Sequence, residues 1–242
     1  MLLHAFPLNA RMWEGQFSLA QTGWHVIAPQ LRGYDAGAGD PPAASVDDYA
    51  GDVVDLLDAL RIKLAVVGGL SMGGYVAFAM LRHAARYVQG LILADTRSQA
   101  DTPDGVAGRT RTLQLLQEKG PAAVADAMLP NVLDETPRTT RPAVVELVRS
   151  LMLSSSAEAI GGGLRALMTR PDSTPLLKTI HVPTLIVVGD EDTLTPPAAA
   201  EEMHRGIAGS ELVRIPQAGH LSNLEQPELF NAALATFLNH RV

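Results

Sequence analysis

The fold is decided at Leu64-Ala-Val-Val-Gly-Gly-Leu-Ser-Met-Gly-Gly74. A short β-branched run, Leu64–Val67, leads directly into the pattern G-x-S-x-G at Gly69–Gly73, and a helical segment, Gly74–Arg86, follows it. A strand, a sharp turn and a helix around that pattern are typical of a nucleophile elbow, in which the turn lifts the serine above the sheet edge. We therefore interpret Ser71 as a nucleophile rather than as a serine that caps the helix.

Short β runs and helical segments alternate on both sides of this elbow. The alternation predicts an α/β fold, with a mostly parallel sheet and helices on both of its faces. The expected strands are Trp24–Pro29, Leu64–Val67, Gly90–Ala94, Thr184–Val188 and Glu211–Ile215, and the expected helices are Val46–Leu60, Gly74–Arg86, Pro197–Gly206 and Pro227–Asn239.

The β pattern vanishes between Thr96 and Ile180. Helical periods occupy that stretch, at Val106–Lys119, Ala122–Leu129, Ala143–Leu153 and Ala157–Arg170. We expect residues 1–96 and 181–242 to form the core and residues 97–180 to form a helical cap insertion. The run Gly161–Gly163 weakens a helix; close helix packing is favoured over the hinge of a lid as its reason.

Composition removes several classes of function. The chain has 242 residues, 47% of them hydrophobic, and a net charge of −7, which does not suit a nucleic-acid-binding surface. It has no cysteine, which excludes disulfides and thiolate catalysis. It contains no apolar run of the roughly 18 residues that span a membrane and no H-E-x-x-H zinc pattern. We expect a cytoplasmic enzyme without metal, cofactor, nucleic-acid partner or membrane partner.

A serine needs a base, and His220 is the best candidate. It lies in a loop after the last expected strand, and α/β sheets place their chemistry at the carboxyl ends of strands. The acid that orients this base should lie between the two in the chain. Asp190, Glu191 and Asp192 follow one strand and Asp95 follows another, and spacing alone does not separate these four acids.

The start of the chain carries a further element. Leu3-His4-Ala5-Phe6-Pro7 predicts a turn at a strand end, where a backbone N–H could join that of Met72 to form an oxyanion hole. We interpret His4 as a structural residue of this turn, because His220 already serves as the base.

Over nearly its whole length the chain resembles the α/β-hydrolase superfamily, and within it bacterial carboxylesterases, cofactor-free perhydrolases and 3-oxoadipate enol-lactonases. The matching elements are His4-Ala5-Phe6-Pro7, Arg32-Gly33-Tyr34, Gly69-Leu70-Ser71-Met72-Gly73-Gly74, Gly189-Asp190-Glu191-Asp192 and Gly219-His220. The family pattern G-x-x-D selects Asp192 as the acid, and the family's oxyanion donors fall on the backbone of Phe6 and Met72. Ala94 to Pro103 and Arg170 to Leu177 look most like the enol-lactonase and perhydrolase branch.

Two departures from the family stand at the front of the chain. Ala5 replaces the usual glycine after the histidine, so the oxyanion loop has less backbone freedom. The family carries about two strands before that turn, whereas here the turn begins at His4; we expect these edge strands to be missing, or the sequence to start after them.

The resemblance implies a serine hydrolase that cleaves small carboxylic esters or lactones through an acyl-serine intermediate. A perhydrolase and a 3-oxoadipate enol-lactonase are the alternatives, and a ligand sensor that signals to a partner protein is the alternative of another class. The natural substrate and the oligomeric state stay open. An arginine of the insertion facing Ser71 would favour the enol-lactonase; the candidates are Arg97, Arg109, Arg111, Arg138, Arg141, Arg149, Arg165 and Arg170.

Overall fold

A parallel sheet supports the whole molecule. The computed structural model describes residues 1–34 and 43–242, and in these residues the strand order is β1-β2-β3-β4-β5, with every neighbouring pair parallel. The strands are β1 (Leu2–Leu3), β2 (Ala65–Leu70), β3 (Val88–Ala94), β4 (Thr184–Gly189) and β5 (Glu211–Ile215). Parallel strands bring their carboxyl ends to one edge, so the loops after β2, β3, β4 and β5 meet there.

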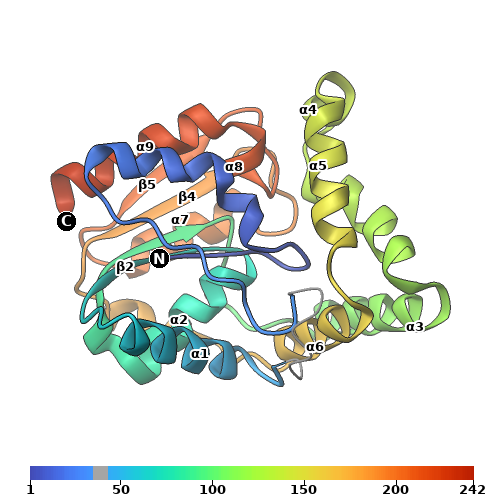
Figure 1. Ribbon diagram of the computed structural model, residues 1–242, viewed down its shortest axis with the longest axis horizontal. Helices are drawn as coiled ribbons and strands as arrows, with labels where there is room; N and C mark the ends of the chain where they lie inside the picture. The colour runs from blue at the N-terminus through green and yellow to red at the C-terminus, as the bar shows by residue number, and fades with distance from the viewer. Residues whose placement is uncertain (35–42) are drawn as a thin grey trace.

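Helices cover both faces of the sheet (Figure 1). One layer holds α1 (Val46–Ala59), α2 (Met72–Ala84) and α7 (Pro197–Gly206), and the other holds η1 (Ala10–Thr22), α8 (Ser222–Glu225) and α9 (Pro227–Arg241). Two short 3₁₀ helices complete the connections, η2 (Ala85–Tyr87) and η3 (Thr174–Thr179). The sequence prediction of an α/β fold with helices on both faces is confirmed.

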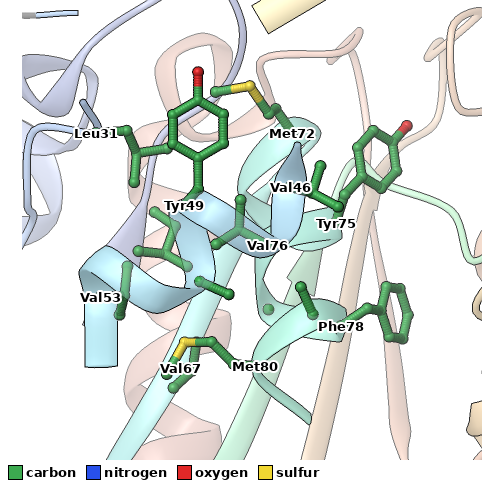
Figure 2. Close-up of a cluster of buried hydrophobic side chains, with 14 of the residues drawn as sticks. Leu31, Val46, Tyr49, Val53, Val67, Met72, Tyr75, Val76, Phe78 and Met80 are labelled. Atoms are coloured by element: carbon green, nitrogen blue, oxygen red, sulfur yellow. The ribbon is translucent and has the colours of Figure 1, made fainter. Parts of the chain in front are cut away.

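Alternation along the strands produces two separate cores. Successive side chains of a strand point to opposite faces, so Val67 packs under α1 and α2 while its neighbour Val66 faces η1 and α9. Figure 2 shows the first of these cores, where Tyr49 of α1 lies near Leu31 and Met72. This packing holds α2, and with it the serine at its start, in one place.

The stretch between β3 and β4 is helical throughout apart from its connections. It contains α3 (Pro103–Val132), α4 (Glu135–Thr140), α5 (Pro142–Leu153) and α6 (Ala157–Met168), which gather at one end of the molecule, away from the C-terminus (Figure 1). Gly120, with φ +77°, interrupts α3 and precedes Pro121, so the two helices expected from the sequence meet at a kink there. The division into core and cap remains a prediction.

One expected strand does not form. Residues 24–30 have no strand structure, although Leu2 N–H donates to the Ile27 carbonyl at 2.7 Å. The sequence prediction of a strand at Trp24–Pro29 is therefore wrong. Its neighbour β1 has only two residues, which leaves too short a partner for a regular ladder. Among the described residues, no helix has the length and apolar character needed to cross a membrane.

Candidate active site

Ser71 sits in a strained turn between β2 and α2. Its backbone has φ +54° and ψ −111°, a conformation that costs a non-glycine residue about 1–3 kcal/mol. Two of its hydrogen bonds reach residues at the end of β3 and just after it: Ser71 N–H donates to the Ala94 carbonyl at 3.0 Å, and the Thr96 hydroxyl donates to the Ser71 carbonyl at 2.9 Å. The end of β3 therefore fixes the turn that follows β2.

Two glycines make this turn possible. A Cβ on Gly69 would lie 2.1 Å from the Gly73 backbone, and a Cβ on Gly73 would lie 2.1 Å from the carbonyl oxygen of Leu3. No side chain fits at such distances, so β1, β2 and α2 approach as closely as they do because both positions lack one.

Ser71, His220 and Asp192 form one hydrogen-bonded chain. The Ser71 hydroxyl lies 2.8 Å from His220 Nε2, and His220 Nδ1 lies 2.9 Å from an Asp192 oxygen. The same carboxylate accepts from the Thr195 hydroxyl at 2.6 Å and from the backbone N–H groups of Leu194 and Thr195. The sequence-predicted residues thus come from three loops, after β2, β4 and β5, and meet at the carboxyl edge of the sheet.

The electrostatics of this chain follow from burial and pairing. Burial alone would lower the pKa of His220, but the charge of Asp192 and its hydrogen bond raise that pKa above its ordinary value. Burial would raise the pKa of Asp192, yet His220 and the bonds from Thr195 lower it below its ordinary value. The pair therefore holds an ionised carboxylate beside an imidazole of increased basicity.

The other acidic candidates have different partners. Asp190 pairs with Arg214 at 2.6 Å near the surface, and Glu191 is exposed. Asp95 is fully buried, and its carboxyl accepts from Gly189 N–H at 2.8 Å and from the Ser222 hydroxyl. Of the four, Asp192 is the one that is hydrogen-bonded to His220.

His4 fixes the turn at the start of the chain. Its Nδ1 donates to the Ala5 carbonyl at 3.0 Å and its Nε2 accepts from Leu31 N–H at 3.2 Å, while burial lowers its pKa to about 4. Leu8 N–H donates to the same Ala5 carbonyl. Because the peptide unit is planar, anchoring this carbonyl also fixes the direction of the Phe6 N–H. The interpretation of His4 as structural agrees with these contacts.

A cavity of about 140 Å³ opens over Ser71 and His220. Its walls combine Phe6, Leu194 and three apolar side chains of α3 and α6 with two arginines, and the remaining lining residues are polar or aromatic. The apolar side chains from those helices are Met128, Val132 and Leu167, and the arginines are Arg97 and Arg109. A larger cavity of about 230 Å³ lies elsewhere, between residues 24–27 and the sheet, and its lining includes none of Ser71, Asp192 and His220. We therefore place the candidate site at the smaller cavity.

Comparison with known proteins identifies the family of this chain. The family model described as "Alpha/beta hydrolase family" matches residues 1–233. The chain belongs to the alpha/beta hydrolase family. An "AB hydrolase superfamily protein YisY" of Bacillus subtilis is 33% identical over 99% of this chain and 91% of its own length. The 3-oxoadipate enol-lactonase 2 of Acinetobacter baylyi is 29% identical over 93% of this chain and 83% of its own.

A solved structure extends the comparison to three dimensions. The thermophilic esterase of Thermogutta terrifontis, with malate bound, superposes on this α/β-hydrolase with a TM-score of 0.94 and 38% identity. The match covers 98% of this chain and 88% of the esterase.

Sequence reasoning missed three residues that organise the site of this α/β-hydrolase. The Thr195 hydroxyl donates to Asp192. A hydroxyl residue three positions after an acidic residue in a loop is a turn pattern, and this pattern could have indicated the role of Thr195. Asp101 lies behind Arg97 and Arg109. Glu225 is fully buried and accepts from the backbone N–H groups of Gly219, Leu221 and Asp134. No pattern in the sequence pointed to the last two.

Proposed function

We propose that this α/β-hydrolase cleaves small carboxylic esters or lactones with Ser71 as nucleophile, His220 as base and Asp192 as the acid that orients His220. The observation that carries the proposal is the continuous chain from the Ser71 hydroxyl to His220 at 2.8 Å and from His220 to Asp192 at 2.9 Å. A serine hydroxyl is a weak nucleophile until a neighbouring base takes its proton, and this geometry supplies that base.

In the proposed reaction Ser71 Oγ attacks the carbonyl carbon while His220 Nε2 takes the hydroxyl proton. The backbone N–H groups of Phe6 and Met72 donate to the oxyanion that forms. Met72 is the first residue of α2, so its N–H has no acceptor within the helix. His220 then gives its proton to the leaving alcohol oxygen, which leaves an acyl-serine. Water, deprotonated by His220, releases the acid and restores Ser71.

The cavity favours small acyl groups. Sites for drug-sized ligands measure roughly 300–1,000 Å³, whereas the space over Ser71 is about 140 Å³. We therefore propose short acyl chains or compact lactones as substrates.

One alternative has a specific observation in its favour. A 3-oxoadipate enol-lactonase acts on a molecule with a second carboxylate, and Arg97 and Arg109 line the cavity beside Ser71. The relative from Acinetobacter baylyi with that activity supports the same alternative.

Replacement of the nucleophile tests the proposal. Ser71→Ala is expected to lower kcat on 4-nitrophenyl acetate by at least about a thousandfold without changing the melting temperature, because little beyond binding and oxyanion stabilisation remains. The control is Ser150→Ala, an exposed serine of α5. Retention of more than about a tenth of the wild-type kcat in Ser71→Ala would rule out the serine mechanism, and a Ser71→Ala protein that bound a partner as wild type does would favour a sensor.

A further inference from the structure

Three arginines share one carboxylate next to the cavity over Ser71. Asp101 accepts from Arg97 at 3.1 Å, from Arg109 at 2.5 Å and from Arg170 at 2.8 Å, and its side chain is fully buried. Burial would raise the pKa of Asp101, but Arg109 and Arg170 lower it below the ordinary value, so the carboxylate carries its charge. Three guanidinium charges against one carboxylate leave an excess of two positive charges.

The excess charge faces the cavity rather than the bulk of the protein. Arg97 and Arg109 line the cavity and are 28% and 22% exposed, whereas Arg170 is 2% exposed and stacks on the Tyr75 ring at 4.2 Å. Arg97 Nε is buried and has no hydrogen-bond partner among the described residues. A buried donor without an acceptor is unfavourable, so the bond to Asp101 leaves this guanidinium incompletely satisfied.

The rest of the cavity lining is mostly apolar or uncharged. Met128, Val132 and Leu167 make an apolar wall, and the part of the lining that the structure describes contains no aspartate or glutamate. A guanidinium pair binds a planar carboxylate well, because its N–H groups match the two oxygens. A ligand that suits these walls has an apolar middle, an ester carbonyl at Ser71 and an anionic end at the arginines.

We propose that Arg97 and Arg109 form a carboxylate subsite, so that this enzyme selects esters or lactones that carry a second, free carboxylate. The preference in hydrolysis rests on the proposed serine mechanism, whereas the binding of a carboxylate by the two arginines does not. Asp101 is a positioning residue in this arrangement, since it holds the guanidinium groups at the cavity wall without facing the cavity itself.

A pair of substrates matched in acyl length tests the subsite. Mono-4-nitrophenyl adipate and 4-nitrophenyl hexanoate differ at one end, where a carboxylate replaces a methyl group. We expect wild-type kcat/KM to be at least about tenfold higher for the adipate ester. Replacement of Arg109 or Arg97 by methionine is expected to lower this ratio about ten- to a hundredfold, the usual effect of losing a charged hydrogen-bond partner.

Controls separate the subsite from general damage. Arg149→Met removes another arginine of the same insertion, one that pairs with Asp126, and should leave the ratio unchanged. Arg97→Lys keeps the charge and should restore part of the ratio, which serves as a second variant if Arg97→Met folds poorly. A wild-type enzyme that prefers the hexanoate, or a ratio that survives both methionine variants, overturns the proposal.

Binding without turnover distinguishes failure of the subsite from failure of the mechanism. In Ser71→Ala, calorimetry should detect monomethyl adipate, which has a free carboxylate, binding more tightly than methyl hexanoate, which has none, and the added change Arg109→Met should remove the difference. Equal binding of the two methyl esters overturns the carboxylate subsite whatever the kinetics show. If Ser71→Ala still hydrolysed both 4-nitrophenyl esters while monomethyl adipate bound more tightly, the serine mechanism would fall and the subsite would stand.

Discussion

Asp192 and Asp95 are buried carboxyls at the ends of neighbouring strands, and their surroundings move their pKa values in opposite directions. Bonds from His220 and Thr195 keep the pKa of Asp192 low. Burial, with the negative charge of Asp192 added to it, raises the pKa of Asp95 well above its ordinary value. Two like charges close together in a protein interior are disfavoured. Asp192 is therefore the more readily ionised carboxyl of the two, and it is the one hydrogen-bonded to His220.

Amide replacements at these two positions should therefore behave differently. Asp192→Asn is expected to lower kcat/KM by about three to four orders of magnitude, because an amide favours the wrong histidine tautomer. Asp95→Asn should cost less than about tenfold, since the amide oxygen still accepts from Gly189 N–H and the bond between Asp192 and His220 stays in place. A crippling effect of Asp95→Asn alone would identify it as the orienting acid.

The pH profile of the same variants gives a second measurement. His220 accepts a proton only when its imidazole is neutral, so kcat/KM should rise with pH through the pKa of His220, which lies above the ordinary 6.5. Asp192→Asn removes the charge that raises this pKa, so the midpoint should move to lower pH, whereas Asp95→Asn should move it less. A midpoint that stayed in place in Asp192→Asn would contradict the pairing.

For single residues, the sequence predicted that an acid would pair with His220, but spacing did not predict which acid. Spacing left Asp190, Glu191, Asp192 and Asp95 equivalent, because which carboxyl reaches His220 depends on how β3, β4 and β5 pack side by side. The resemblance to the family selected Asp192, and the hydrogen bond to His220 agrees with that choice. The role of Asp101 was not predicted, because its contacts with the arginines depend on how the helices pack.

The turn between β2 and α2 leaves no room for added side-chain atoms at Gly69 and Gly73. Gly73→Ala would place a Cβ 2.1 Å from the Leu3 carbonyl oxygen, and we expect a loss of about 1–3 kcal/mol in unfolding free energy together with loss of activity. Gly51→Ala in α1 has nothing within 4 Å of its added Cβ and should stabilise the fold by about 0.5–1 kcal/mol. Thermal denaturation measures both, and a neutral Gly73→Ala would contradict the described contact.

Local patterns predicted most elements of the core. Pro197–Gly206 and Glu211–Ile215 form the helix and the strand expected there, because a proline marks the start of the helix and a short run with apolar residues marks the strand. Trp24–Pro29 has the same β-branched character but forms no strand, since strand formation depends on a partner elsewhere in the chain.

In the molecule as a whole, α6 meets residues near the start of the chain at one of its glycines. Gly163 packs against Phe6 and Tyr34, and an added Cβ would lie 2.1 Å from the Tyr34 hydroxyl and 2.8 Å from Phe6 Cδ2. Gly161 has its nearest neighbour, Arg165, at 3.5 Å, an ordinary contact. The interpretation of these glycines as close packing therefore applies to Gly163 in particular.

Alanine substitutions test this contact between α6 and Phe6. Gly163→Ala should displace Phe6, whose N–H is a proposed oxyanion donor, and lower kcat by about tenfold or more with a smaller effect on KM. Gly161→Ala should leave kcat within about twofold, because alanine suits a helix and meets no close atom. Equal losses in both variants would favour a hinge over packing. The sequence indicated α5, α6 and the two halves of α3 but missed the short α4, and the orientation of these helices over Ser71 depends on tertiary contacts such as this one.

Glu225 has a consequence for how this enzyme can diverge. Its single carboxylate holds the loop of His220 through Gly219 and Leu221, and it also holds Asp134, which follows the end of α3. A mutation that shifts the end of α3 must therefore break a buried bond or pull on the loop that carries His220. Changes of side chain on the cavity walls carry no such penalty. New specificities should arise by exchanging residues such as Met128 and Leu167 in place, and insertions or deletions near Asp134 should be selected against.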